Sequence, residues 1–187
     1  MSRASLLASV SILFSTATLA AGAPNWTANY PACRHHDELL KTGPLKVGVR
    51  ILTNNVPLAQ QFERALDYWS SILDLAWHNE DSADCTIQVL DGKSDLFATA
   101  DRCRCISARA QFPDQPGFEG WIAFNPGMRL NAEDLYRLSV HEIGHLLGLG
   151  HSSSPRSVMY FFDVDSPIEL DTADLRALAA KHKLRNR

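Results

Sequence analysis

The sequence has no excess of positive charge and, beyond its first two dozen residues, no long hydrophobic run. Lys and Arg number 18 against 21 Asp and Glu, so the net charge is −3 at pH 7. A mildly acidic chain lacks the electric field with which proteins attract nucleic acid or anionic lipid. A membrane span takes about 18 consecutive apolar residues, and no such run occurs after residue 23. We therefore expect neither nucleic acid nor a membrane as a stable partner.

Internal repeats, low-complexity segments and compositional extremes are also absent. The chain is 45% hydrophobic and 21% charged, with ten glycines and nine prolines, which is typical of globular proteins and not of disordered or fibrous ones. Its 187 residues suit one domain that can bury a core of its own. We expect this domain to be monomeric.

The first 23 residues have the layout of a secretory signal peptide. Arg3 supplies a basic start, Leu6–Leu19 is mostly apolar, and small residues follow up to Ala23. The apolar part is too short and too interrupted to predict a membrane anchor. We expect residues 1–23 to be removed and residues 24–187 to form a secreted, extracellular domain. Asn25, in Asn-Trp-Thr, is then a candidate glycosylation site.

Four cysteines follow, and none has the CxxC spacing of a thiolate zinc site. An even number in an exported chain predicts two disulfides. Cys103 and Cys105 are one residue apart, and in an extended strand they would point to opposite faces. We therefore expect each of them to pair with Cys33 or Cys85, and either of the two pairings is compatible with the sequence.

Apolar periodicity predicts a mixed α and β domain. Alternation over Leu45–Leu52 indicates a half-buried strand, and apolar residues spaced three and four apart from Leu58 to Leu73 indicate a helix opened by Pro57. Asn131 and Asp171 are expected N-caps of two later helices, of which the first runs to about Leu147. Further strands are expected at 85–90, 106–112 and 121–124, and the basic tail Lys181–Arg187 is expected to be a solvated end.

The segment from 141 to 151 reads His-Glu-Ile-Gly-His-Leu-Leu-Gly-Leu-Gly-His. On a helix, His141 and His145 project from one face and can reach a single zinc ion. Gly148 permits a sharp exit from the helix, so the chain can turn back and present His151. Glu142 lies beside the metal position. Three protein ligands leave a fourth position for water, which is the pattern of a catalytic zinc site.

This segment, followed by Met159 in Ser157–Tyr160, resembles the HExxHxxGxxH and Met-turn signature of the metzincins. Within the metzincins, a serine directly after the third histidine, here Ser152, resembles the pattern of the matrixins (matrix metalloproteinase-type peptidases). The resemblance implies an α+β zincin/metzincin fold: a twisted mixed β-sheet with three main helices, among them the active-site helix and a C-terminal helix. It further implies that the three histidines hold zinc, that Glu142 is the catalytic carboxylate and that Met159 forms the floor beneath the metal.

The expected function is a secreted zinc endopeptidase with one catalytic Zn²⁺ and a protein or peptide substrate. Glu142 takes a proton from the activated water and passes it to the departing amine. The strand at 106–112 can form the rim of the cleft and pair with an extended peptide. Tyr160, Phe161 and Phe162 are expected to wall the pocket for the residue after the cut, which favours a hydrophobic side chain there.

Some positions depart from the matrixin pattern. Phe161 and Phe162 stand where animal matrixins usually carry a proline and then a tyrosine. No histidine lies between Cys105 and His141, so we expect no second, structural zinc. Calcium binding by Asp114 and Glu119 stays open, because two acids in a Pro/Gly loop are usual in a solvated turn. Two alternatives also stay open: a secreted zinc-binding module without peptidase activity, and a disulfide-linked binding protein whose histidines are incidental.

Overall fold

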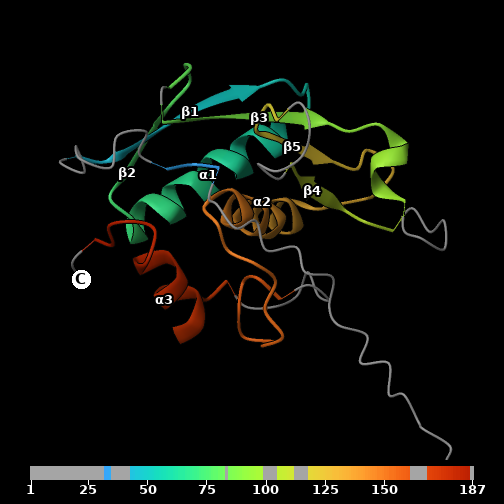
Figure 1. Cartoon of the computed structure of the whole chain (residues 1–187). Coiled ribbons are helices and arrows are strands. Elements are labelled where there is room, and N and C mark those ends of the chain that lie inside the picture. The colour runs from blue at the N-terminus through green and yellow to red at the C-terminus, as the bar shows by residue number, and fades with distance from the viewer. Residues whose placement is uncertain are drawn as a thin grey trace, which may run out of the picture.

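The computed structural model describes residues 32–34, 43–82, 84–98, 105–111, 118–160 and 168–185. They form a mixed five-stranded sheet with helices packed beneath it (Figure 1). This is the α+β architecture that the sequence predicts. In chain order the elements are β1 (Leu45–Ile51), α1 (Val56–Ile72), β2 (Leu75–His78), β3 (Cys85–Asp91), the 3₁₀ turn η2 (Ser94–Phe97), β4 (Ala108–Ala110), β5 (Trp121–Phe124), α2 (Ala132–Leu146) and α3 (Thr172–Ala179).

The sheet has the strand order β2-β1-β3-β5-β4. All neighbouring strands are parallel except β4, which runs antiparallel to β5 with Arg109 opposite Ala123. In the part of the chain that the structure describes, β4 therefore forms an edge of the sheet and has a partner strand on one side. This edge also contacts α2 (Figure 1).

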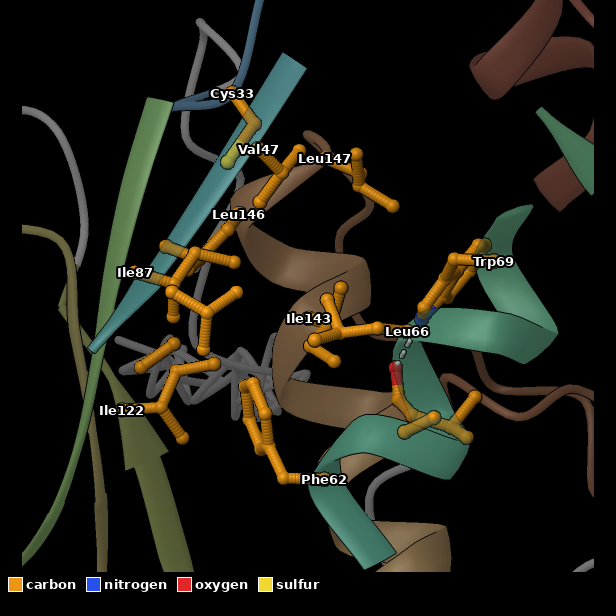
Figure 2. Packing of buried hydrophobic residues seen from close by; sticks show 14 of the residues in the cluster. Cys33, Val47, Phe62, Leu66, Trp69, Ile87, Ile122, Ile143, Leu146 and Leu147 are labelled. Carbon is orange, nitrogen blue, oxygen red and sulfur yellow. Dashed lines mark hydrogen bonds between the residues drawn. The ribbon is translucent and has the colours of Figure 1, made fainter. Parts of the chain in front are cut away.

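The core lies between the sheet and the two long helices. Val47, Ile87 and Ile122 project from the sheet toward Phe62 of α1 and Ile143 of α2, and all five are buried (Figure 2). The apolar stripe predicted for α1 is confirmed, because its members are all buried: Leu58, Phe62, Ala65, Leu66, Trp69, Ile72 and Leu73. Burial of this stripe fixes α1 against α2.

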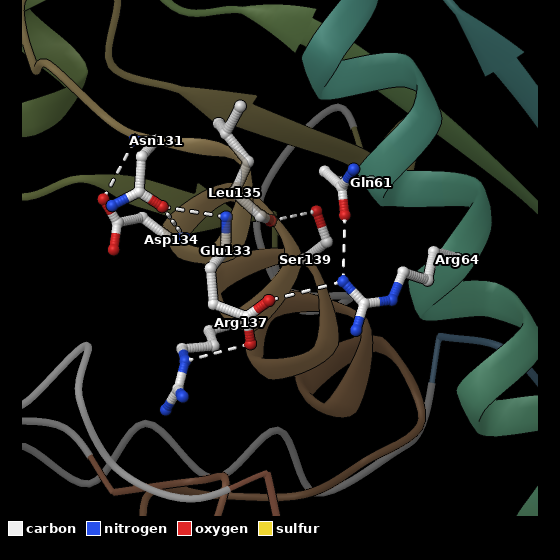
Figure 3. Close-up of polar contacts among 8 residues, drawn as sticks. All are labelled: Gln61, Arg64, Asn131, Glu133, Asp134, Leu135, Arg137 and Ser139. Atoms are coloured by element: carbon white, nitrogen blue, oxygen red, sulfur yellow. Dashed lines mark hydrogen bonds and ion pairs between the residues drawn. The ribbon is translucent and has the colours of Figure 1, made fainter.

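Helices α2 and α3 begin where the sequence predicts, and α1 begins one residue before the predicted Pro57, with Asn55 as its N-cap. The Asn131 side chain accepts hydrogen bonds from the backbone N–H groups of Glu133 and Asp134, and the Asp134 carboxylate accepts one from the N–H of Asn131 (Figure 3). Asp171 and Asp174 form the same capping box at α3. Such a box satisfies backbone donors that a helix leaves free at its start. At α2, Glu133 also lies 3.3 Å from the Arg64 guanidinium of α1, which ties the two helices together (Figure 3).

Two details of the secondary structure differ from the prediction. Strand β2 was not predicted, because four residues with one fully buried side chain, Leu75, show little alternation. Its position is determined by parallel pairing with β1, a contact between distant segments. Strand β4 is three residues long and not seven, and Phe112 lies outside the described residues.

The expectation of a solvated basic tail holds only in part for residues 181–185: Lys183 and Arg185 are exposed, but backbone groups of the segment are bound to the rest of the domain. Leu184 forms an antiparallel bridge with Leu73, and the Asp74 N–H donates to the Lys183 carbonyl at 2.9 Å. The tail thus adds a short extended segment to the chain that connects α1 with β2. Backbone groups beyond the end of α1 need partners, and the tail supplies them.

The predicted cysteine pairing is also wrong. Cys33 is bonded to Cys85, with the two Cα atoms 4.8 Å apart. Cys33 is fully buried, and its N–H donates to the carbonyl of Leu146 at the end of α2. The sequence spacing cannot show that residues 32–34 pack between α2 and the start of β3, and this packing decides the pairing. Cys105 is disulfide-bonded too, and Cys103 lies outside the described residues.

The predicted signal peptide and Asn25 lie outside the described residues as well. Among the described helices, none combines the length and the apolar content needed to cross a bilayer.

Candidate metal centre

Three histidine rings converge at the end of α2. The helix places His141 and His145 one turn apart, and the chain that leaves it brings His151 back to them. The ring centroids lie 4.8 Å (His141–His145), 5.3 Å (His141–His151) and 4.7 Å (His145–His151) apart. One ring nitrogen from each lies within 4.8 Å of the others, and among the described residues this is the one such group. A single metal ion can therefore contact all three.

Backbone carbonyls orient two of these rings. His141 Nδ1 lies 2.8 Å from the carbonyl oxygen of Val158, and His145 Nδ1 lies 2.9 Å from that of Leu149. A carbonyl only accepts, so each Nδ1 carries the proton and each Nε2 is unprotonated. The Nε2 atoms of His145 and His151 lie 3.2 Å apart. Two rings are thus held in the tautomer that a metal ligand needs.

The surroundings keep all three imidazoles neutral. Desolvation is the main cause that lowers the pKa of His141 to about 4, and the neighbouring His151 lowers it further. Desolvation and then the other two rings lower the pKa of His145 well below its usual value, and desolvation lowers that of His151. Neutral imidazoles are the protonation state that binds metals. Three imidazole nitrogens within reach of one point are a ligand set that suits zinc.

A buried carboxylate follows His141 directly. The Glu142 side chain is held by a backbone hydrogen bond from Ala110 of the edge strand β4. Desolvation raises its pKa to about 7, although the Ala110 hydrogen bond and the Arg109 charge both lower it. A carboxyl group with a pKa near neutrality can both accept and return a proton. The structure therefore places a buried carboxyl group with a raised pKa between α2 and the edge of the sheet.

Met159 packs against α2 at Gly144. A Cβ atom built on Gly144 would lie 2.6 Å from Met159 Sδ and 3.2 Å from Trp69 Cζ2. Met159 and Trp69 are fully buried, and the Trp69 indole N–H donates to the Val140 carbonyl at 3.1 Å. The absence of a side chain at Gly144 lets the Met-turn approach the helix closely.

Gly144→Ala is expected to lower the free energy of unfolding of the metal-free protein by about 1–3 kcal/mol, because the added methyl group overpacks a dense site. Urea denaturation in the presence of a chelator measures this. Gly43→Ala is the control, since a Cβ there meets no atom within 4 Å. Equal stability of the two variants would contradict the close packing of Met159 on the helix.

A buried polar pair supports the Met-turn from below. The Ser157 hydroxyl donates to Asp174 Oδ2 at 2.6 Å and accepts from the Met159 N–H at 2.9 Å. Burial is the main cause that raises the pKa of Asp174, and the Ser157 hydrogen bond opposes it. This support is not predictable from the sequence pattern. The only local signal was the Asp-x-x-Asp capping pattern of α3, and it does not point to Ser157.

Other expected site residues are only partly within the described chain. Tyr160 follows Met159, is half-buried and bridges to Ser152. Phe161 and Phe162 lie outside the described residues, so the apolar pocket stays a prediction. Glu119 is exposed and Asp114 lies outside the described residues, so calcium binding also stays a prediction.

Several known proteins resemble this chain in sequence. Macrophage metalloelastase of Rattus norvegicus is 32% identical over 105 residues, which are 53% of this chain and 22% of that protein. Metalloendoproteinase 1-MMP of Arabidopsis thaliana is 35% identical over 109 residues, 53% of this chain and 30% of that protein. Stromelysin-2 of Rattus norvegicus is 26% identical over 179 residues, 88% of this chain and 34% of that protein.

The chain spans about a fifth to a third of the length of these relatives. The matrixin family model matches residues 50–182, which include all three histidines, Glu142 and Met159. This match covers well over half of the sequence. The chain belongs to the matrixin family.

Proposed function

We propose that this protein is a secreted zinc-dependent endopeptidase. The observation that carries the proposal is the convergence of three neutral imidazoles, whose ring nitrogens lie within 4.8 Å of one another, with the buried carboxyl group of Glu142 directly after the first of them in α2. His141, His145 and His151 are the ligands in this proposal. Membership of the matrixin family and the names of the relatives, among them a metalloendoproteinase, support it.

In this proposal the three histidines bind the metal and Glu142 transfers protons. Zinc bound by the three histidines supplies Lewis-acid activation of water and of the scissile carbonyl. Glu142 accepts the proton of the attacking water at a carboxylate oxygen and returns it to the nitrogen of the leaving amine. Burial raises its pKa to about 7 in the metal-free chain, and bound zinc would lower it, so that the carboxylate form that accepts the proton is present near neutral pH. Met159 provides apolar packing behind the ligands.

In this proposal the substrate peptide pairs with the edge strand β4. The described part of β4 has a partner strand on one side only, and such an edge pairs readily with an extended peptide. Because Glu142 is bonded to Ala110 of the same strand, a peptide that lies along β4 passes next to this carboxylate. Tyr160, Phe161 and Phe162 then form the pocket for the residue after the cut, which favours a hydrophobic side chain.

The proposal also includes export of the protein from the cell. Residues 1–23 act as the signal peptide, and residues 24–187 form the catalytic domain outside the cell. The disulfide between Cys33 and Cys85 supports this, because disulfides persist in oxidising compartments. N-terminal sequencing of the protein recovered from the culture medium tests the cleavage site.

The purified protein loaded with zinc is expected to cleave a generic unfolded protein substrate such as casein. A chelator should abolish this cleavage, and added zinc should restore it, because the histidines release the metal as the chelator binds it. Mass spectrometry of the fragments shows whether hydrophobic residues follow the cut. Stoichiometric zinc without chelator-sensitive cleavage favours the zinc-binding module, and absence of zinc favours the disulfide-linked binding protein.

A further inference from the structure

The C-terminal segment 181–185, which we name the C-terminal clamp, contacts the turn that follows the active-site helix. Lys181 Nζ donates to the Gly148 carbonyl at 2.5 Å, and His182 Nε2 lies 2.8 Å from the Leu147 carbonyl. A carbonyl accepts, so His182 Nε2 donates. The last carbonyls of a helix lack partners within the helix and carry its negative dipole end, where cationic donors bind favourably.

The clamp is anchored independently of these two contacts. The Arg185 N–H donates to the Ile72 carbonyl at 2.8 Å, and Arg185 Nε donates to the Leu73 carbonyl at 3.0 Å. Lys183 Nζ also lies 2.6 Å from Asp74 Oδ2, but the Lys183 side chain is 66% exposed, so this ion pair adds little to the anchoring. These partners belong to the end of α1 and the chain that enters β2. The clamp therefore connects a rigid part of the core with the end of α2.

The turn that the clamp contacts sets the position of two of the three histidines. Gly148 has φ = +89°, and the Leu149 N–H donates to the Gly144 carbonyl at 2.9 Å. The Leu149 carbonyl orients the His145 ring, and His151 follows Leu149 by two positions in the chain. A shift of residues 147–150 thus moves both the group that orients His145 and the backbone that carries His151.

We propose that Lys181 and His182 are positioning residues of the metal centre. They hold the turn 147–150 at the place where His151 meets His141 and His145, and in this way they strengthen zinc binding. The inference rests on the proposed function, because it takes zinc as the metal. It assigns a role to a basic tail that lies apart from the metal-binding segment in sequence.

The test compares single substitutions within the clamp. Lys181→Met keeps the aliphatic stem but loses the donor to Gly148, and His182→Phe keeps a ring but loses the donor to Leu147. Each is expected to raise the zinc dissociation constant about tenfold, as loss of groups that orient ligands does elsewhere. Competition with a chromogenic chelator measures this constant. Lys181→Arg, which keeps a donor of similar reach, should bind zinc as the wild type does.

Lys183→Met is the matched control, because it removes the same charge from the same segment. The Lys183 side chain contacts Asp74 and not the turn 147–150. The zinc affinity of this variant should equal that of the wild type. Equal zinc binding by Lys181→Met and the wild type overturns the proposal. Equal weakening in Lys183→Met also overturns it, because the effect would then be one of general stability or charge.

Hydrogen exchange of the zinc-free proteins gives a second readout. The amide of Leu149 should exchange faster in Lys181→Met than in Lys183→Met, because the turn opens locally when its clamp is lost. Unchanged exchange at Leu149 overturns the proposal. The outcome is separable from the proposed function: weakened zinc binding in Lys181→Met, with a wild type that cleaves no substrate, keeps the clamp and rejects the peptidase.

Discussion

Replacing Glu142 with glutamine is expected to lower kcat about 10²- to 10⁴-fold, the range that general acid–base groups contribute. Glutamine has nearly the shape of glutamate, so the fold and the three histidines stay in place. Its amide cannot accept the proton of the attacking water or return one to the leaving amine. Steady-state cleavage of a fluorogenic peptide by the zinc-loaded variant measures the loss, and metal analysis shows that zinc is still bound.

Glu133→Gln is the matched control for this experiment. Glu133 lies in the first turn of the same helix, half-exposed, and pairs with Arg64 and Arg137 at its surface. Loss of its charge should leave kcat unchanged. A Glu142→Gln variant that cleaves as fast as Glu133→Gln would contradict the proton-transfer role.

The pH dependence of the wild type follows from the same carboxylate. Burial raises the pKa of Glu142 to about 7 in the metal-free chain. A neighbouring zinc ion stabilises the charged form and lowers this pKa. The base acts when deprotonated, so kcat/KM should fall as the pH drops through a pKa that lies below 7. The residual activity of Glu142→Gln should lack this acidic limb.

The parts of the fold that the sequence predicts are those that local patterns determine. The stripe from Leu58 to Leu73 is apolar at helical spacing, and burial against the sheet follows from it. The caps at Asn131 and Asp171 depend on residues within three positions. The residues that form the stripe or a cap all lie within about one helix length of one another in the sequence. The sequence alone therefore shows every residue that takes part.

The parts that the sequence does not predict depend on contacts between distant segments. The disulfide joins residues 52 positions apart, and the prediction from strand geometry paired the wrong cysteines. The C-terminal clamp meets Asp74 at a separation of 109 residues. A basic tail usually has no fixed backbone partner, whereas this one meets backbone groups beyond the ends of α1 and α2.

In the site, too, the features set by local sequence were predicted and those set by contacts between distant segments were not. His141, Glu142 and His145 were predicted because one helical turn brings them together. Three supports escaped prediction: the carbonyl of Val158 that orients His141, the hydrogen bond from Ala110 to Glu142, and the Ser157–Asp174 pair under the Met-turn. Each support comes from another element, so it becomes visible only when the chain is folded.

Zinc at about 1,000 times its dissociation constant is expected to raise the free energy of unfolding by about 4 kcal/mol. For a domain of this size that corresponds to a rise in Tm of roughly 8–16 °C. The cause is that the folded chain holds three ring nitrogens within 4.8 Å of one another, whereas the unfolded chain presents them singly. Thermal denaturation of the metal-free and the zinc-saturated protein measures the difference.

His151→Gln is expected to remove most of this zinc-dependent rise. His151 is partly exposed, whereas His145 is only 3% exposed, so loss of the His151 ring deletes a ligand without opening a cavity in the core. The metal-free variant should therefore unfold close to the metal-free wild type. His78→Gln, which changes a histidine on β2, should keep the full rise. A His151→Gln protein that also keeps it would show that the third zinc ligand is another group.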